Sequence, residues 1–418
     1  MGIIVQKFGG TSVANPEKIH NVAKAVIREK ENGNDVIVVV SAMGHTTDYL
    51  IKLANEVTQT PDSREMDMLL STGEQVSIAL LSMAIQAHGH KAISMNGQQV
   101  GIITENIHSK ARIVDIKTEK LQKYISEGKI IVVAGFQGVT PEGEITTLGR
   151  GGSDTSAVAI AAALKADRCD IYTDVEGVYA TDPRIVPNIQ KLETVSYEEM
   201  LELARVGANV LHPRSVETAK QFNVPLRVRS SFKLDNLGTL IIGVNDMEIY
   251  KPVAGVAADT SQVRISLSNL PDIPGTAAKL FGSLAKNNIS VDMIIQSLAN
   301  NGTNSIAFTV DSDDLNDSLN ILQEFQNELG AGEILIDKDI AKVSIVGAGM
   351  VDRPGIAADM FKALAEKNIN IKMISTSEIK ISCLVEKENA VPSIKALCEE
   401  FDLETSIIAE VKGDLPNV

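Results

Sequence analysis

Short apolar runs alternate with amphipathic stretches along residues 1 to about 245. Val36–Val40 and Ile130–Ala134 are apolar at every position, which is typical of parallel strands buried on both faces. Helical spacing is clearest in one early stripe, formed by Ile19, Val22, Ala23, Val26 and Ile27. Asn15 and Pro16 suit the N-cap and first position of that helix. The alternation predicts an α/β fold: a mainly parallel sheet covered by helices on both faces, a three-layer αβα sandwich.

Glycine-rich or polar residues follow several of these predicted strands. Lys7-Phe8-Gly9-Gly10-Thr11-Ser12 follows the apolar run Ile3–Val5, and Ser41, Gly135 and Thr173 follow three later strands. In parallel sheets ligands bind outside the carboxyl ends of the strands. A glycine turn presents backbone N–H groups to an anion, and Lys7 adds a positive charge, so the pattern predicts a phosphate site. The alternative is a simple tight turn beside a solvated lysine. The convergence of four strand ends favours the phosphate site.

Three further segments carry candidate chemistry. Gly149–Ser156 is a second glycine-rich turn before an Ala-rich helix over 157–164, and Arg150 within it suits a bidentate carboxylate or phosphate contact. Ser153 and Asp154 have a simpler interpretation as the N-cap of that helix. Glu74 lies in an apolar helix predicted over 66–88, where a charged residue usually faces solvent. The polar loop 173–184 is either a solvated connection or, after a core strand, a nucleotide contact.

The C-terminal part of the chain contains an internal repeat with an offset of 80 residues. The segment beginning at Val263 matches that at Val343, and Asp272-Ile273-Pro274-Gly275 matches Asp352-Arg353-Pro354-Gly355. Each copy predicts strand, Pro-Gly turn, helix, strand, strand, helix and strand, which is a ferredoxin-like βαββαβ unit. A paired module without catalytic residue types suggests ligand sensing. The alternative is a platform for dimerisation.

Length, charge and cysteine content limit the classes of protein that remain. A chain of 418 residues predicts two or three domains. The net charge of −15 argues against a nucleic-acid partner and requires a local cationic pocket for any anionic ligand. Three widely spaced cysteines indicate reduced thiols rather than disulfides or a zinc site. With no apolar run of membrane-spanning length and no signal pattern, we expect a cytoplasmic protein without a membrane partner.

Taken together, these segments resemble the aspartokinase family over essentially the whole chain. The family's signatures are matched in order by Lys7–Ser12, Ser71-Thr72-Gly73-Glu74, Gly149–Asp154 and Tyr172–Arg184. The repeat resembles the paired ACT domains of feedback-regulated members. The resemblance implies an amino acid kinase catalytic domain over 1–246, a linker over 247–260, and ACT domains over 261–335 and 336–418.

The resemblance also implies an activity and a set of site residues. The reaction is ATP-dependent phosphorylation of the β-carboxylate of L-aspartate, the first step of lysine, threonine and methionine biosynthesis, with Mg²⁺ carried on ATP and no metal site of the protein's own. The implied catalytic residues are Lys7 and Asp154. The implied ATP-binding residues are Lys7, Gly9, Gly10, Thr11, Ser41, Thr173, Asp174, Tyr179, Asp182 and Arg184. The implied substrate-binding residues are Thr47, Glu74, Arg150, Gly152 and Ser153.

Feedback control by lysine, threonine or both is expected at the repeat. A helix N-terminus after Gly275 can take an amino acid's carboxylate, while Asp272 or Asp292 can take its ammonium group. The expected effector-binding residues are Asp272, Gly275, Thr276, Ala277, Asp292, Gln296, Asn370, Ile371, Ser375 and Thr376. Open sheet edges in both copies predict a homo-oligomer assembled through the ACT domains. A second, shorter subunit that begins near Met247 is compatible with this assembly.

One departure and two rival functions remain at this stage. Some family members carry a nucleotide-contacting lysine where this chain has Asn209, which leaves that ATP contact in doubt. Another amino acid kinase, acting on glutamate or acetylglutamate, would share the phosphate turns, but we do not expect it to carry both the Ser71–Glu74 segment and the tandem repeat. A non-catalytic amino-acid sensor would keep the repeat and could lose Lys7 or Asp154, which are both present.

Overall fold

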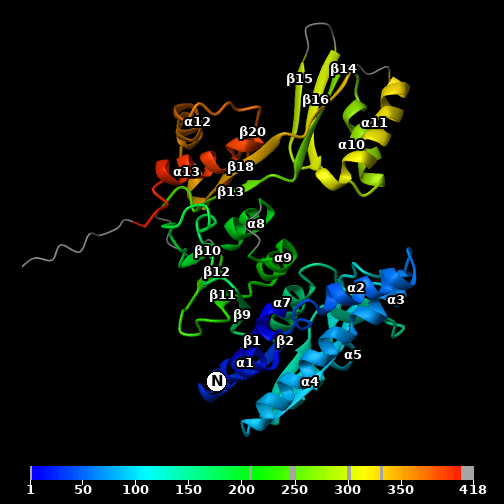
Figure 1. The fold of residues 1–418 in the computed structure, drawn as a ribbon, viewed down its shortest axis with the longest axis vertical. Coiled ribbons are helices and arrows are strands. Elements are labelled where there is room, and N and C mark those ends of the chain that lie inside the picture. The colour runs from blue at the N-terminus through cyan, green and yellow to red at the C-terminus, as the bar shows by residue number, and fades with distance from the viewer. Residues whose placement is uncertain are drawn as a thin grey trace, which may run out of the picture. The chain divides into compact units, whose positions relative to one another are not determined.

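The structure is a computed structural model that describes residues 2–206, 210–243, 251–298, 303–329, 333–351 and 353–405. Asn209 and Met247, singled out above, lie outside the described residues, as does Asp352 of the second repeat. The chain forms two compact units. The first unit comprises Met1–Val178 and Lys191–Glu248, and the second comprises Tyr179–Gln190 and Ile249–Val418. Figure 1 shows the elements of both.

The first unit is built on an eight-stranded sheet with the order β10-β12-β11-β9-β1-β2-β6-β3. The pairs from β11 to β3 are all parallel, whereas β12 runs antiparallel to β11. The strands are β1 (Ile3–Phe8), β2 (Asp35–Val40), β3 (Ala92–Met95), β6 (Ile130–Ala134), β9 (Arg168–Thr173), β10 (Thr194–Ser196), β11 (Leu226–Ser230) and β12 (Thr239–Ile242). The predicted mainly parallel sheet is confirmed.

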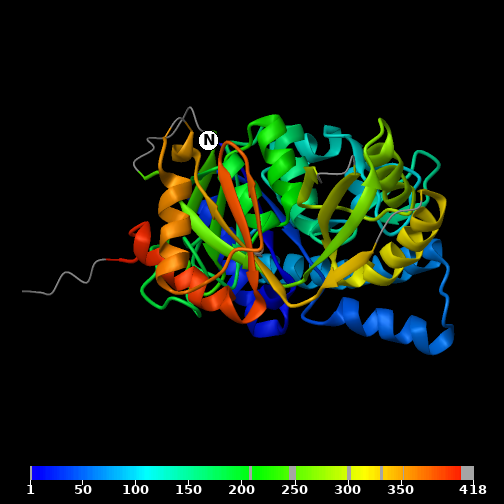
Figure 2. The same cartoon turned by 90° about the horizontal axis from the view of Figure 1, so that it is seen from above.

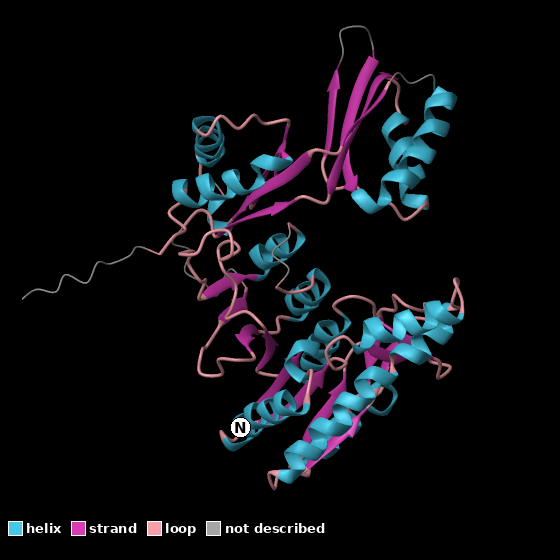
Figure 3. Ribbon diagram, in the orientation of Figure 1, coloured by secondary structure: helices cyan, strands magenta, loops and turns pink. Residues whose placement is uncertain are grey.

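Helices cover both faces of this sheet (Figure 3). On one face, Phe8 and alternate residues of β2 join a core with α1 (Pro16–Glu31) and α4 (Thr72–Ala87). The opposite face packs against α7 (Gly152–Leu164), and Lys7 belongs to this face because successive strand residues alternate. The remaining helices are α2 (Thr46–Val57), α3 (Ser63–Leu70), α5 (Gly97–Val100), α6 (Glu119–Ser126), α8 (Tyr197–Arg205) and α9 (Pro213–Phe222).

A second, smaller sheet has four short strands in the spatial order β5-β4-β7-β8. Its strands are β4 (Ile102–Thr104), β5 (Ile113–Ile116), β7 (Gln137–Val139) and β8 (Ile145–Thr147). β8 leads directly into the turn that carries Arg150. This sheet therefore supports one of the predicted substrate segments.

One local prediction needs correction and another gains detail. Lys7 lies near the end of β1, and a single 3-10 turn, η1 (Gly10–Val13), lies between β1 and α1. The Asn15 side chain caps α1 by accepting from Lys18 N at 2.9 Å, as predicted. The helix predicted over 66–88 is two helices, α3 and α4, that meet at Ser71. Within the described chain the run Ser63–Ala87 is long and apolar enough to span a membrane, but half of its most apolar window is buried in the fold, as in a core helix.

The second unit contains the two βαββαβ modules that the repeat predicts. The first module has the sheet order β15-β16-β14-β17, with every pair antiparallel. It consists of β14 (Gln262–Pro271), α10 (Thr276–Lys286), β15 (Ile294–Leu298), β16 (Thr303–Asp311), η3 (Ser312–Asp314), α11 (Leu315–Leu329) and β17 (Ile334–Asp337).

The second module has the same architecture but takes one strand from elsewhere. It consists of β18 (Ile340–Val346), η4 (Ala348–Met350), α12 (Ile356–Glu366), β19 (Met373–Thr376), β20 (Lys380–Glu386), η5 (Lys387–Asn389) and α13 (Ala390–Glu400). The strand taken from elsewhere is β13 (Gly255–Asp259), which pairs with β18 on the side away from β20, in the order β13-β18-β20-β19. Figure 2 shows α12 and α13 beside this sheet.

The origin of β13 corrects the predicted layout of the repeat. β13 lies in the segment 247–260, which was predicted to be a linker, and it precedes the first module in the chain. The first module is therefore inserted between two neighbouring strands of the second module's sheet. The physical reason is that β18 needs a partner at its open edge, and the buried Val256 and Ala257 supply both hydrogen bonds and apolar contact.

Candidate active site

The predicted phosphate site is centred on an ion pair between β1 and α7. Lys7 Nζ lies 2.6 Å from Asp154 Oδ1, and each side chain is 12% exposed. The pairing is possible because Lys7 is on the α7 face of the sheet and Asp154 lies in the first turn of α7. The ammonium group is thereby held at the carboxyl end of a central strand, with its hydrogen-bonding capacity only partly used.

Backbone segments after β1 and β2 pack tightly against each other at this edge. Gly44 N donates to Gly10 O at 3.0 Å, and Ser41 N donates to Phe8 O at 3.1 Å. A Cβ atom at Gly10 would lie 2.7 Å from Ala42 O, so any side chain there would force the two segments apart. Thr11 is exposed and Ser41 is half-buried. The structure thus brings Lys7, Gly10 and Ser41 to one edge of the sheet, as predicted.

Glu74 is buried rather than solvated, contrary to the default for a charged residue in an apolar helix. It lies in the first turn of α4 and is 2% exposed. Its Oε1 accepts from Ala42 N at 3.0 Å, while its Oε2 has no hydrogen-bond partner within the described chain. Burial raises the pKa of Glu74 to about 8. A carboxylate with one vacant, desolvated oxygen is suited to receive a cationic group. Thr47 is half-buried in the first turn of α2.

The Gly149–Gly152 turn is held in shape by its glycines. Gly149 and Gly151 have φ values of 76° and 69°, and a Cβ atom at Gly151 would overlap the His212 ring at 2.2 Å. Neither Ser153 nor Asp154 caps α7, because Gly151 is the N-cap and both residues are buried within the first turn. The N-cap interpretation of these residues is therefore wrong, which leaves both side chains available for other contacts. Ser153 packs against Gly135, at the end of β6.

Arg150 is exposed and lines an open groove of about 1430 Å³ in the first unit. Ser109, Lys110 and His212 also line it, but Lys7, Glu74 and Ser153 do not. The structure therefore brings the predicted phosphate residues together, and places the predicted substrate arginine on the rim of a neighbouring hollow.

The five predicted nucleotide residues from the end of β9 onwards are divided between the two units. Thr173 and Asp174 belong to the first unit, where Thr173 Oγ1 donates to Asp174 Oδ1 at 3.1 Å. Tyr179, Asp182 and Arg184 belong to the second. There the Arg184 guanidinium pairs with Asp182 at 2.6 Å and holds the pKa of that carboxyl below its usual range.

The segment Tyr179–Gln190 is bound into the second unit by backbone hydrogen bonds. Val256 N of β13 donates to Ala180 O at 2.7 Å, and Gln190 N donates to Leu403 O at 2.9 Å. A loop that sequence analysis assigned to the catalytic domain is thus anchored on the second module's sheet.

The predicted effector residues occupy edge strands, loops and the first turn of α10 in the two modules. Gly275, with φ 99°, opens α10, and Thr276 Oγ1 donates to Ile273 O at 3.1 Å. Asp272 accepts from Asn304 Nδ2 at 2.8 Å. Gln296 lies on the edge strand β15, and Ser375 and Thr376 lie on the edge strand β19, as expected for residues that face a second sheet. Asn370 and Ile371 precede β19, and Ala277 is half-buried in α10.

Asp292 has a partner that sequence analysis did not identify. Its carboxylate pairs with the ammonium group of Lys342, a buried lysine on β18. This ion pair joins the first module to the second, beside an apolar cluster made by Met293, Met373 and their neighbours. Any amino acid ammonium group that bound Asp292 would have to share it with Lys342.

Comparisons with known proteins decide the family. Residues 2–230 match the model of the amino acid kinase family, and residues 263–325 and 343–401 match an ACT domain model. The chain is 54% identical to Aspartokinase 2 of Bacillus subtilis (strain 168), over 96% of this chain and 98% of that protein. It is 53% identical to Aspartokinase of Bacillus sp. (strain MGA3), over 98% and 99% respectively. The chain belongs to the aspartokinase family.

Solved structures agree with this assignment. An aspartate kinase from Synechocystis is 50% identical, with a TM-score of 0.54 over 96% of this chain and 70% of that one. E. coli aspartokinase III in complex with aspartate and ADP is 27% identical, with a TM-score of 0.80 over 96% and 100%. The same enzyme in complex with lysine and aspartate is 28% identical, with a TM-score of 0.75 over 96% of this chain and 99% of that one. The predicted fold class, kinase activity and ACT domains are confirmed for this aspartokinase.

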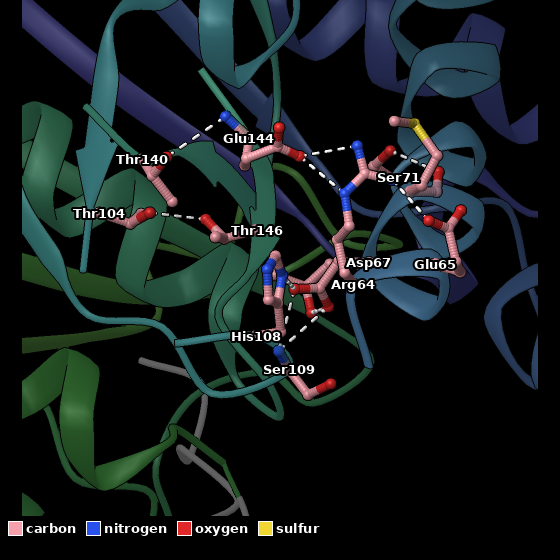
Figure 4. A network of polar contacts seen from close by, with 12 residues as sticks. Arg64, Glu65, Asp67, Ser71, Thr104, His108, Ser109, Thr140, Glu144 and Thr146 are labelled. Carbon is pink, nitrogen blue, oxygen red and sulfur yellow. Dashed lines mark hydrogen bonds and ion pairs between the residues drawn. The ribbon is translucent and has the colours of Figure 1, made fainter. Parts of the chain in front are cut away.

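Sequence analysis missed a buried cluster that this aspartokinase has beside its Arg150 turn. It is formed by Asp67, His108 and Ser109, which Figure 4 labels, together with Thr147, and none of the four belongs to a segment that the family resemblance singled out. The only sequence signal is an aspartate at a position of α3 that falls among apolar residues. Within the described chain, no group of three or more His, Cys, Asp or Glu side chains is arranged to hold a metal ion.

Proposed function

We propose that this aspartokinase transfers the γ-phosphoryl group of ATP to the β-carboxylate of L-aspartate and forms 4-phospho-L-aspartate. The observation that carries the proposal is the Lys7–Asp154 ion pair at the end of β1, beside two tightly packed glycine segments. The aspartate and ADP present in the E. coli aspartokinase III complex support both substrates. The nucleophile and the phosphate are both anionic, so positioning and charge neutralisation must provide most of the catalysis.

Each proposed role follows from a contact or its vacancy. Lys7 stabilises charge on the transferring phosphoryl group, and Asp154 keeps the Lys7 ammonium in place. The backbone at Gly9 and Gly10 accommodates phosphate oxygens beside the Lys7 ammonium group, which lies 3.5 Å from the position that a Cβ atom on Gly9 would take. Thr11 and Ser41 add hydroxyl donors to this phosphate path. ATP would bring Mg²⁺, which would neutralise phosphate charge.

The amino acid is held by groups of opposite charge. Glu74 receives the substrate ammonium group on its vacant Oε2, and Arg150 pairs with a substrate carboxylate. Thr47, Gly152 and Ser153 complete the pocket. Thr173, Asp174, Tyr179, Asp182 and Arg184 hold the nucleotide.

We also propose that the reaction is the first step of lysine, threonine and methionine biosynthesis. Lysine, threonine or both then inhibit the enzyme by binding at the ACT domains. The lysine in one E. coli aspartokinase III structure supports lysine as an effector. The positions of β15 and β19 at the edges of their sheets support assembly into a homo-oligomer through these domains. We place the enzyme in the cytoplasm, and we propose a catalytic domain over 1–246 and ACT domains over 261–335 and 336–418, the second of which also takes β13 from the segment 247–260.

Comparing the activity of the enzyme on three acidic substrates tests the proposal. Coupled ADP release is measured with L-aspartate, L-glutamate and N-acetyl-L-glutamate at equal concentrations. We expect turnover with L-aspartate at least about a hundredfold above the other two, because a buried charged site discriminates strongly against misplaced carboxylates. Equal or faster turnover with either glutamate compound would assign the chain to another branch of the amino acid kinases.

A further inference from the structure

Asp67 is a fully buried carboxylate that the proposed chemistry does not use. It lies on α3 and is 0% exposed. Its Oδ1 accepts from Thr147 Oγ1 at 2.6 Å, and its Oδ2 lies 2.9 Å from His108 Nδ1. Both oxygens are within 3.1 Å of Ser109 N (Figure 4). A buried charge is tolerated only when its hydrogen-bonding capacity is met, and here three residues from two segments meet it.

The segment that Asp67 holds is in an unfavourable backbone conformation. Ser109 has a φ of 66°, in the left-handed region that residues with a Cβ atom rarely adopt. Such conformations persist when the surrounding structure determines them, and they cluster at functional sites. The hydrogen bonds from Ser109 N to the two Asp67 carboxylate oxygens hold Ser109 in this conformation.

The Ser109 segment lies directly against the turn that carries Arg150. Ala111 N donates to Thr147 O at 3.0 Å. Ser109 O lies 3.1 Å from the position that a Cβ atom on Gly149 would take. Arg214 spans the same two segments, because its guanidinium donates to Leu148 O at 3.0 Å and to Ala111 O at 2.7 Å.

Asp67 is also bonded to the start of that turn. Thr147 is the last residue of β8 and precedes Arg150 by three positions. One carboxylate therefore fixes both the strand that enters the turn and the segment that packs against it. Ser109, Lys110, Gly149 and Arg150 then line one groove.

We propose that Asp67 is a positioning residue for substrate binding: it holds the Ser109 segment against the Gly149–Gly152 turn and so sets the position of the Arg150 guanidinium. The inference rests on the proposed role of Arg150 in binding a substrate carboxylate. Asp67 and Glu74 lie on the same helical run, Ser63–Ala87, two turns apart. That run thus supports both charged ends of the substrate, directly through Glu74 and indirectly through Asp67.

The test compares Asp67→Asn with Arg64→Gln in the full chain. Asn keeps the shape but weakens the charge-assisted hydrogen bonds to Ser109 and His108. Arg64 is the control, because its ion pair with Glu144 also joins α3 to the β8 hairpin but does not contact the Ser109 segment. For Asp67→Asn we expect KM for L-aspartate to rise about 10- to 100-fold, as misplacement of a binding group does, with KM for ATP changed less than about twofold. Arg64→Gln should change neither.

A double variant separates positioning from general destabilisation. If Asp67 acts through Arg150, adding Asp67→Asn to Arg150→Gln raises KM for L-aspartate by less than about twofold over Arg150→Gln alone. If the two substitutions instead raise KM for L-aspartate multiplicatively, the inference is overturned. It is also overturned if Asp67→Asn raises KM for L-aspartate and KM for ATP by similar factors. If Asp67→Asn does not fold, Thr147→Val removes one donor to the carboxylate and keeps the branched shape on β8. It should raise KM for L-aspartate about threefold in the same selective way, and an unchanged value contradicts the proposal.

The single variant Arg150→Gln distinguishes the two levels of the argument. If it leaves KM for L-aspartate unchanged, the proposed role of Arg150 is wrong and the inference falls with it. If it raises that KM while Asp67→Asn does not, only the inference about Asp67 is wrong.

Discussion

At the scale of single residues, burial decides which charged side chains can do chemistry. The charges of Lys7 and Asp154 neutralise each other, and both side chains are largely buried. Glu74 is also buried, but within the described chain its Oε2 has no hydrogen-bond partner. Sequence analysis could place Lys7 and Asp154 because each sits in a glycine-rich segment. It could not predict the burial of Glu74, because α4 is apolar on several sides: Val76 is 52% exposed although Glu74 is 2% exposed.

Replacing Lys7 tests its role in phosphoryl transfer. We expect Lys7→Ala to lower kcat about a hundred- to thousandfold, since one charge-stabilising donor in such a site contributes on the order of 3–4 kcal/mol. The measurement is steady-state ADP release, with thermal unfolding as a check on folding. Lys7→Ala leaves the Asp154 carboxylate without its ion-pair partner, and the double variant Lys7→Ala/Asp154→Asn removes that unpaired charge. It should stay equally slow, and recovery of kcat in this double variant would mean that Lys7 serves only to neutralise Asp154.

Glu74 should make the stability of the protein depend on pH. Its pKa is about 8 in the folded protein and near 4.5 when unfolded, so the folded state binds the extra proton between these values. The stability from protonated Glu74 is complete below about pH 4.5 and is lost as pH rises to about 8. Glu74→Gln should therefore be more stable than the parent at pH 8, by on the order of 2–4 kcal/mol, and much less so at pH 5. Urea unfolding at both pH values measures this, and an equal difference at both contradicts the shifted pKa.

The same group should make substrate binding depend on pH. An ionised Glu74 is required to pair with the ammonium group, so KM for L-aspartate should fall as pH rises from about 6.5 to 8. In Glu74→Gln this KM should be higher and nearly flat over that range, with KM for ATP little changed. A variant in which only KM for ATP changes would place Glu74 in nucleotide binding.

At the scale of elements, the site depends on close backbone approach at the carboxyl edge of the sheet. The central strands were predictable because runs such as Val36–Val40 are uniformly apolar. The 3-10 turn after Gly9 and the origin of β13 were not. Both depend on tertiary packing, and the sequence of β13, Gly255–Asp259, is short and carries no alternation that marks a strand edge.

Gly10→Ala tests the importance of this close approach. A Cβ atom there would lie 2.7 Å from Ala42 O, so the segments after β1 and β2 must separate. We expect kcat/KM for ATP to fall at least about tenfold, because the phosphate path loses its geometry. Gly128→Asn is the control: Gly128 has a φ of 70° and open space around it, which asparagine tolerates. A normal kcat/KM in Gly10→Ala would show that this packing does not shape the nucleotide site.

At the scale of the whole molecule, three of the proposed nucleotide residues belong to the same compact unit as the ACT modules. The loop with Tyr179, Asp182 and Arg184 is bonded to β13, a strand of the second ACT sheet. Sequence analysis placed this loop in the catalytic domain because it follows a core strand. The hydrogen bonds that anchor it come from residues more than 70 positions away, which no local pattern indicates.

Effector control should be separable from catalysis. We expect Gln296→Ala or Thr376→Ile to raise the inhibitory concentration of lysine or threonine by roughly five- to 150-fold, the usual range of allosteric coupling. Uninhibited kcat should stay within about twofold, because both residues lie on edge strands of the ACT sheets. The assay adds lysine and threonine singly and together. If neither inhibits the parent enzyme in any combination, the modules serve only for assembly.

The central claim is that a phosphoryl group moves to the β-carboxylate of L-aspartate, and identifying the product tests this most directly. The enzyme is incubated with ATP, Mg²⁺, L-aspartate and hydroxylamine, and the trapped product is identified by mass spectrometry and NMR. We expect aspartate β-hydroxamate in an amount equal to the ADP released, and only trace amounts with Lys7→Ala. ADP release without hydroxamate, or hydroxamate on the α-carboxylate, would contradict it.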